Sequence, residues 1–237
     1  MRLEQLFQQI DFFLKGSSVW ESRGVISTLL EIIAIFSRND LKSEILKEVD
    51  RHSNVLNKIN RIEHIDQQKL QQVLAKLDAI GGELYAIPGK IGISLMENEL
   101  FKCISQRNAI PGGTCAFDLP AYHYWLELNS AQRKRDMEDW MQPFAPIRTA
   151  IDLLMNFIRQ SAFPTEELSV NGFFQKTLDH SLPYQLLRVG LQRSQPYYAE
   201  ISGGKHRFTI RFMHNNGIER PTQSSGDVDF LLTCCLL

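Results

Sequence analysis

The chain has 237 residues, enough for one large domain or two small ones. Hydrophobic residues make up 43% and charged residues 22% of it, as in ordinary globular proteins, so disorder as the main state is excluded. The formal net charge of −1 excludes a whole-molecule field that attracts polyanions or membrane surfaces, and any charge-driven binding must come from a local cluster.

Neither a targeting segment nor a membrane span is predicted. The first strongly apolar run, residues 24–36, contains Glu31 and is too short to cross about 30 Å of hydrocarbon. Glu4 and Asp11 interrupt the apolar residues at the N-terminus, unlike a secretory signal. The four cysteines, Cys103, Cys115, Cys234 and Cys235, have no zinc-binding spacing, so we expect no metal. With no signal and no membrane span, we expect a cytoplasmic protein with free thiols and no membrane insertion. No cofactor is expected.

The first part of the chain has the three-four spacing of apolar residues that is typical of helices. One stripe runs over residues 3–14 and a second over residues 25–36. A third stripe, over residues 45–59, alternates strictly by four and three, which predicts a seam for another helix. His52 lies in this seam and is interpreted as a hydrogen-bonded core or interface histidine, not a ligand. From the seam we expect a dimer formed through helical surfaces.

Two more helices are predicted before residue 110. Asp66 can cap a helix whose stripe covers residues 70–80 and which ends at Gly81 and Gly82. A short helix is expected over residues 93–106.

The pattern changes at Ile110. Residues 110–128 combine glycines, many aromatic residues and Pro120, which favours an edge or bent strand. Asn129 or Ser130 then caps a return to helix, and residues 147–158 form the last long apolar stripe.

From Phe163 onward the signals are those of strands. Gly203-Gly204 and Asn216-Gly217 are hairpin signals between them. Helices followed by strands predict an α+β fold, a mostly helical bundle with an antiparallel β-rich domain. We assign residues 1–109 and 129–162 to the helical domain, and 110–128 and 163–237 to the β-rich domain. The expected strands cover residues 169–178, 184–192, 197–201, 205–213 and 227–235.

One of these strands is the most informative local pattern. Alternate residues of a strand face opposite ways, so one side of 205–212 is apolar and faces inward. That side holds His206, Phe208, Ile210 and Phe212. The other side carries Lys205, Arg207 and Arg211, spaced at about 6.6 Å per two-residue step. Such a row can act together on one extended anionic partner. The alternative is a solvated face balanced by carboxylates such as Glu200 or Asp229.

Patterns for catalysis are weak, and we expect no enzyme. The sequence lacks the nucleophile-elbow, zinc-protease and phosphate-loop motifs. Cys115, Asp118 and His123 could form a thiol nucleophile with a base and an orienting group, but Cys115 fits better as a small core residue and His123 as a polar spacer.

Nucleic-acid binding would use the same basic strand, and it is the alternative function together with binding of another peptide. Aromatic side chains could serve as stacking platforms for bases. The near-neutral total charge weighs against this, since phosphate neutralisation dominates such affinity. The aromatic candidates are Tyr122, Trp125, Tyr197 and Tyr198.

Four blocks, in this order along the chain, resemble the ZapD family, and Cys234-Cys235 also fits. The resemblance covers nearly the whole chain. It implies a cytoplasmic, non-enzymatic homodimer with a helical and a β-rich domain. It also implies that the chain binds the C-terminal tail of the division protein FtsZ and bundles FtsZ protofilaments at the midcell division ring. The blocks are Ile110 to Leu126, Ile158 to Ala162, Asn171 to Gln175 and Ile201 to Met213.

The resemblance also implies site residues. Arg207 and Arg38 match two basic positions of the family, whereas the third reads Glu99 here, and Arg107 or Lys102 could substitute for it. The family usually begins with a short Phe-Glu-x-Pro-Leu segment before the residues seen here as 2–4, so we expect a piece that completes the β domain to be absent. With the basic strand, the partner-binding residues expected are Arg207, Lys205, Arg211, Arg38 and His123, and no nucleic acid is expected.

Overall fold

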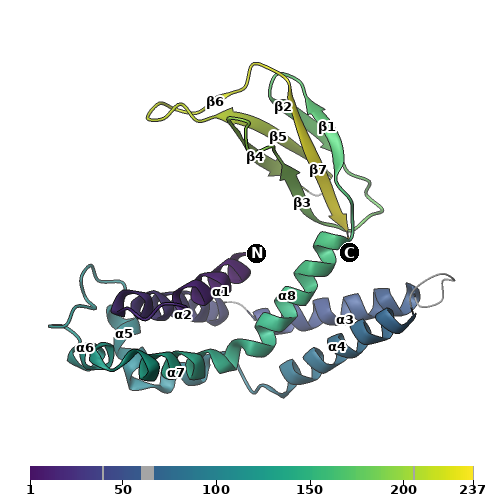
Figure 1. The fold of residues 1–237 in the computed structure, drawn as a ribbon. Coiled ribbons are helices and arrows are strands. Elements are labelled where there is room, and N and C mark those ends of the chain that lie inside the picture. Colours follow the sequence, from purple (N-terminus) through teal and green to yellow (C-terminus); the bar gives the residue numbers. More distant parts are fainter. Residues whose placement is uncertain (39, 60–66, 205, 237) are drawn as a thin grey trace. The chain divides into compact units, whose positions relative to one another are not determined.

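The computed structural model describes residues 1–38, 40–59, 67–204 and 206–236. These form two compact units, Met1–Leu154 and Met155–Leu237 (Figure 1). Helices make up the first unit, and every strand of the described chain lies in the second, where all pairings are antiparallel. The predicted α+β class is confirmed.

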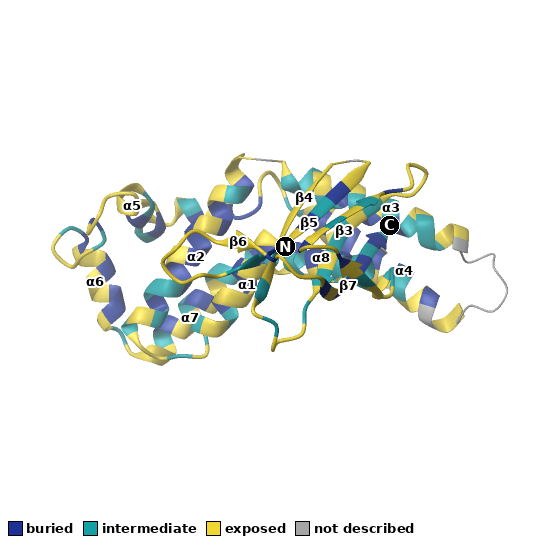
Figure 2. Cartoon of the chain, turned by 90° about the horizontal axis from the view of Figure 1, so that it is seen from above, coloured by how far each residue is buried: buried dark blue, intermediate teal, exposed yellow. Residues whose placement is uncertain are grey.

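The first unit contains helices at nearly every stripe that the sequence shows. In α1 the buried residues are Leu3, Leu6, Phe7 and Ile10, and this side of the helix packs against α2. Figure 2 shows exposed residues on the outer sides of the helices and buried ones on the sides that they turn to each other. The elements are α1 (Arg2–Phe13), α2 (Val19–Arg38), α3 (Leu41–Ile59), α4 (Gln67–Ala86), η1 (Ile93–Glu97), α5 (Glu99–Arg107), α6 (Pro120–Glu127), α7 (Ser130–Met141), η2 (Gln142–Phe144) and α8 (Ala145–Gln160), which runs on into the second unit.

The predicted seam on α3 is occupied by α4 of the same chain. Val49, in the middle of the seam, is 2% exposed, and a Cβ built on Gly81 of α4 would lie 3.8 Å from its Cγ1 atom. The seam therefore no longer gives a reason to expect a dimer through this surface. Asp66, the expected cap of α4, lies outside the described residues.

The expected end of α4 at Gly81 and Gly82 is wrong, because the helix continues to Ala86. Glycine inside a helix costs about 1 kcal/mol relative to alanine. Beyond the glycines, Leu84 extends the apolar stripe and is fully buried, which stabilises the fold by about 1.5–3 kcal/mol. This burial, with the continued backbone hydrogen bonds, outweighs the low helix propensity.

His52 is a core histidine, as predicted. It is 1% exposed, and its Nδ1 lies 2.8 Å from the carbonyl oxygen of Glu48, so Nδ1 carries the proton and donates it. Burial lowers the pKa of His52, the bond to Glu48 opposes this shift, and the charge of Arg51 adds to the lowering.

The lowered pKa of His52 predicts that the first unit, which we call the helical unit, becomes less stable in acid. The unfolded chain takes up a proton near the usual histidine pKa of about 6.5, and the folded chain only at lower pH. The stabilisation is thus complete above that value and is lost as the pH falls below it. His52→Leu should flatten this part of the pH profile in urea unfolding followed by tryptophan fluorescence, since Trp20, Trp125 and Trp140 all lie in this unit. An unchanged slope would contradict the assignment.

The strand expected within residues 110–128 is wrong, since Pro120–Glu127 forms α6 in the first unit. Proline occupies the first turn, where its missing N–H is harmless and its fixed φ favours a helix. The buried residues have helical spacing and anchor α6 in the core. They are Leu119, Tyr122, Trp125 and Leu126.

Contacts with α7 and α2 hold α6 in place. The Trp125 indole N–H donates to Asp136 on α7 at 2.9 Å. The Arg23 guanidinium lies 4.8 Å from the centre of the Tyr122 ring, whose burial raises the pKa of Tyr122 to about 12. The predicted cap of the following helix is confirmed, because the Asn129 side chain accepts a hydrogen bond from the Gln132 backbone N–H at 2.9 Å.

The second unit is a sandwich of two sheets. The first has the order β1-β7-β3, and the second has β2-β5-β4 with β6 also paired to β5. Four predicted strands correspond to β3, β4, β5 and β7, and β6 was not predicted. The predicted strand 169–178 is divided, because Ser169 ends β1, a turn follows, and only Phe173–Thr177 form β2. The strands are β1 (Thr165–Ser169), β2 (Phe173–Thr177), β3 (Tyr184–Gly190), β4 (Tyr197–Gly203), β5 (Arg207–His214), β6 (Thr222–Gln223) and β7 (Val228–Leu236).

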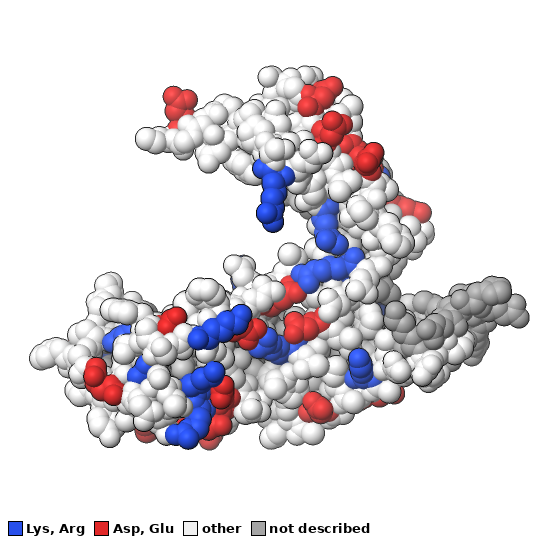
Figure 3. Space-filling model, in the orientation of Figure 1, with Lys and Arg blue, Asp and Glu red and all other residues white. Residues whose placement is uncertain are grey.

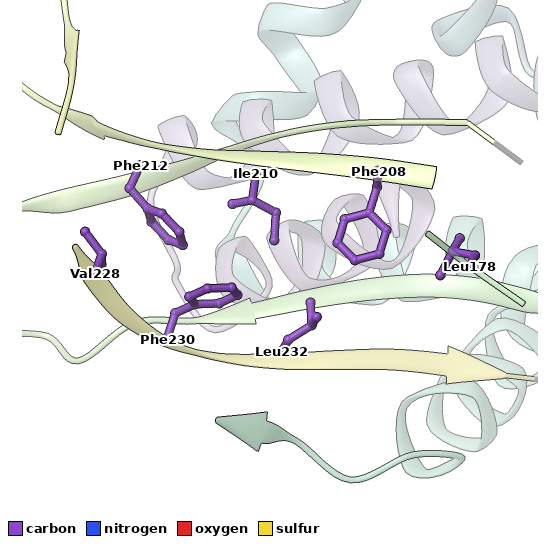
Figure 4. Packing of buried hydrophobic residues seen from close by; sticks show 7 residues of the cluster. All are labelled: Leu178, Phe208, Ile210, Phe212, Val228, Phe230 and Leu232. Atoms are coloured by element: carbon purple, nitrogen blue, oxygen red, sulfur yellow. The ribbon is translucent and has the colours of Figure 1, made fainter. Parts of the chain in front are cut away.

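The core of this unit lies between the sheets (Figure 4). Alternate residues of β5 meet alternate residues of β7, as expected for two half-buried strands. Phe208, Ile210 and Phe212 are at most 1% exposed, which confirms their predicted inward orientation. They face Val228, Phe230 and Leu232, and Leu178 closes one end.

His206, predicted to share the inward side of β5, is exposed. The strand begins one residue later, at Arg207, so the alternation of strand faces does not apply to His206. Its ring stacks instead on His180, with ring centres 4.0 Å apart and planes at 24°. Lys205 lies outside the described residues.

Two turns position the strands around β5. At Gly203-Gly204 the predicted hairpin is confirmed, with the Gly204 N–H donating to the Arg207 carbonyl at 2.9 Å. Between β1 and β2, Gly172 has a φ of 66°, and a Cβ there would lie 2.6 Å from the Ser224 carbonyl oxygen. Only glycine fits this turn.

Candidate functional site: the outer face of the β5 sheet

The side of β5 opposite the core carries Arg207, Thr209 and Arg211, and we call the sheet surface around them the β5 outer face. Residues paired in register point to the same side of a sheet, so the neighbours on β2 and β4 share this face. They are Phe173, Gln175 and Thr177 on β2, and Tyr198, Glu200 and Ser202 on β4.

Neither Arg207 nor Arg211 makes a side-chain hydrogen bond or an ion pair within the described part of the chain. Both are exposed. The lysine of the neighbouring strand β2, in contrast, has an internal partner. Lys176 is paired to Phe208 in register, on the core side, and its ammonium group lies 2.7 Å from Glu167 of the other sheet. The two arginines of β5 are therefore available to a ligand.

The carboxylates considered as their internal partners do not neutralise them. Glu200 is directly opposite Arg211 on β4, yet no oxygen of Glu200 lies within 4.0 Å of an Arg211 nitrogen. Asp229 lies between the buried residues Val228 and Phe230 of β7, and so belongs to the outer face of the other sheet. Figure 3 shows acidic side chains gathered on the β1 side of the unit.

Shallow hollows follow the β5 outer face and its continuation. The first, of about 460 Å³, lies around Arg211, Thr209 and Ser202. A second, of about 480 Å³, shares Thr209 and Ser202 and reaches Arg207 and His206. A third, of about 200 Å³, shares His206. Neighbouring hollows share lining residues, and we call the three together the trough.

Aromatic side chains flank this trough in part. Phe173, opposite Arg211 on β2, is 39% exposed, and Tyr198 on β4 is 38% exposed. Two of the other proposed stacking platforms, Tyr122 and Trp125, are buried in the helical unit and cannot stack on bases. The third, Tyr197, is half-buried against His214.

The remaining expected site residues belong to the helical unit. Arg38 is the last residue of α2 and is exposed, where a cation complements the negative end of the helix dipole. His123 on α6 is half exposed, with Nδ1 3.9 Å from a Glu127 oxygen. The structure thus brings Arg207 and Arg211 together in one unit and places Arg38 and His123 in the other.

Neither candidate for the third basic position has a free cation. Glu99, at that position, lies in the first turn of α5, where a carboxylate is stabilised by the helix dipole. Its oxygen lies 3.2 Å from the ammonium group of Lys102. The guanidinium of Arg107 lies 3.1 Å from Asp118.

The possible thiol site contains one of its expected contacts. The Cys115 thiol donates to an Asp118 oxygen at 3.2 Å. Cys115 is exposed, so its interpretation as a core residue is wrong. Cys115 lies in the turn before α6, and the core beside it is filled by aromatic side chains of α6. Asp118 also pairs with Arg107, which gives this carboxylate a structural role.

Within the described ranges, no group of three or more histidine, cysteine, aspartate or glutamate side chains is placed to hold a metal ion. No helix of the described chain is long and apolar enough to cross a membrane.

Comparison with known proteins decides the family. A family model with the description "ZapD: Cell division protein" matches residues 1–211. The chain belongs to the ZapD family of cell division proteins. Two of the blocks on which the resemblance rested, 171–175 and 201–213, lie in the sheet that carries the β5 outer face, at β2 and at the β4–β5 hairpin.

Curated relatives match over the whole chain. The cell division protein ZapD of Methylococcus capsulatus is 51% identical over 237 residues, which are 100% of this chain and 93% of the relative. Proteins of the same name from Aromatoleum aromaticum and Nitrosomonas europaea are 35% and 36% identical over 100% of this chain, and over 92% and 90% of their own lengths. The names of these ZapD proteins describe cell division, not an enzyme activity.

Sequence reasoning missed two features of the β5 outer face. The exposure of Phe173 could have been found, because adjacent phenylalanines at 173 and 174 must point to opposite sides of a strand. The hollow beside His206 had no such signal, because it depends on the loop of residues 178–184 folding back against the start of β5.

Proposed function

We propose that this protein binds the C-terminal tail of FtsZ on the β5 outer face and, as a cytoplasmic homodimer, cross-links FtsZ protofilaments at the division ring. The observation that carries the proposal is the pair Arg207 and Arg211, which line the trough along β5 and have no internal partner in the part of the chain that the structure describes. Family membership supplies the division context. Binding is the proposed activity, not catalysis.

An acidic, extended peptide suits this face. Arginine can hold a carboxylate with two parallel hydrogen bonds, which gives direction as well as charge. The two guanidinium groups are four residues apart on one strand, about 13 Å, so one extended segment can reach both. Phe173 and Tyr198 add apolar contact beside them. Because a flexible peptide loses entropy on binding, one tail should bind weakly.

Bundling then requires two sites on one particle. A two-fold dimer presents the same surface twice. Two sites that face filaments with many tails gain from effective concentration, so weak single-site binding is enough for cross-linking. Arg38 and His123 of the helical unit are the further partner-binding residues that we propose.

The test uses a fluorescently labelled FtsZ tail peptide. The peptide should bind in an anisotropy titration, unlabelled single-stranded DNA should not displace it, and raising the ionic strength past about 0.15 M should weaken it, because exposed charges are screened over roughly 8 Å. With assembled FtsZ, the protein should co-sediment in bundles and itself run as a dimer. Displacement by DNA would favour the nucleic-acid alternative, and bundling by a monomer would contradict the bivalent mechanism.

A further inference from the structure

The third hollow of the trough differs from the other two because its described lining holds no lysine, arginine or carboxylate. Arg207 lines the second hollow, and Arg211 lines the first together with Glu200. We call the third hollow the His206 socket, lined by Leu178, His180, Leu182, Pro183, Tyr184, Gly204 and His206. The nearest acidic side chain in sequence, Asp179, accepts hydrogen bonds from the Ser181 N–H at 2.9 Å and hydroxyl at 2.7 Å, which lower the pKa of Asp179 and hold its charge within its own loop.

The socket is continuous with the site of the two arginines. It shares Gly204 and His206 with the hollow that reaches Arg207. A segment that runs along β5 from Arg211 past Arg207 therefore meets the socket next. Arginines line the first two hollows and no charged side chain lines the third, so this path suits a segment that has carboxylates first and an apolar side chain after them.

The socket is built from parts that hold each other in place. The rings of His180 and His206 stack at 4.0 Å, and the Leu178 N–H donates to the His206 carbonyl at 2.9 Å. On the far side, the Tyr184 N–H donates to the Leu182 carbonyl at 3.1 Å. Because the loop is already ordered, filling the socket costs little of the conformational entropy that opposes binding.

Resting on the proposed function, we propose that the His206 socket receives one apolar side chain of the bound acidic peptide. Its volume of about 200 Å³ equals that of six or seven water molecules at about 30 Å³ each, room for a single large side chain. The charged contacts at Arg207 and Arg211 attract and orient the peptide, and the socket fixes its register along the strand. A peptide with the same charge but without the apolar residue then binds less well.

Leu182 is the position at which to test the socket. It is 42% exposed, so replacing it leaves the core intact. Leu182→Ser should weaken binding of the FtsZ tail peptide about five- to tenfold, the effect of losing part of an apolar contact. The matched control is Leu231→Ser, since Leu231 is 43% exposed on the outer face of the other sheet, and this variant should bind as the unchanged protein does.

A peptide series completes the experiment. Each apolar residue of the tail peptide is changed to serine in turn, and one of these changes should weaken binding to the unchanged protein but no longer matter in Leu182→Ser. If the peptide binds, Arg207→Glu abolishes binding and Leu182→Ser has no effect, the socket proposal is wrong while the proposed function stands. If the unchanged protein does not bind the peptide at all, the proposed function fails, and the socket proposal fails with it.

Discussion

Replacing Arg207 with glutamate is expected to abolish measurable binding of the FtsZ tail peptide and bundling of FtsZ filaments. Losing a charged hydrogen-bonding partner costs about 1–3 kcal/mol, so Arg207→Ala should weaken binding about 5- to 150-fold. Glutamate adds like-charge repulsion to that loss. Arg207→Lys should lie between the unchanged protein and Arg207→Ala, because lysine keeps the charge but cannot form the two-pronged contact with a carboxylate.

The fold should survive these changes, since Arg207 is exposed and the core residues of β5 point to the other side. Far-ultraviolet circular dichroism and the melting temperature check this. Arg188→Glu is the matched control. Arg188 is an exposed arginine of β3 whose neighbours Leu187 and Val189 pack into the core, which places it on the outer face of the other sheet. Normal bundling by a folded Arg207→Glu protein would move the tail-binding site away from β5.

The second large effect concerns stability and the helical unit. Arg133 of α7 is 5% exposed, and its guanidinium donates to the Leu126 carbonyl at 2.9 Å, the Ser17 carbonyl at 2.7 Å and the Ser22 hydroxyl at 3.1 Å. A further bond reaches the Leu128 carbonyl. This buried cation joins α7 to the end of α6 and to the start of α2.

Arg133→Met should lower the free energy of unfolding by about 3 kcal/mol, because methionine leaves the buried carbonyl groups without donors. With a denaturant slope of about 1–3 kcal/mol/M, the urea midpoint should fall by about 1 M or more. Tryptophan fluorescence follows this unit alone. Arg135→Met is the matched control on the same helix and should change little, because the Arg135 side chain is exposed and, within the described residues, bonds only to Gln132. Equal effects of the two changes would contradict the role given to Arg133.

Much of the fold could be predicted because its signals are local. The three-four stripes of α1, α2 and α3 and the two-residue alternation of β5 each depend on which side of one element is buried, and neighbouring residues reveal that side. For the same reason the inward orientation of Phe208, Ile210 and Phe212, and the outward one of Arg207 and Arg211, could be read before the structure. Family membership was likewise visible in short blocks of sequence.

The sequence by itself therefore determined the α+β class, most of the helices and strands, the ZapD family and the strand that carries the candidate site. Only the tertiary structure decided which elements cover each other. Burial of Leu84 extended α4 through two glycines, and residues 120–127 became a helix with one buried side. Lys176 pairs with a carboxylate of the other sheet, whereas Arg207 and Arg211 have no such partner among the described residues. These outcomes depend on contacts between residues far apart in the chain. The free energy of burial in these contacts exceeds the local propensities, and neighbouring residues do not reveal which distant residues will meet.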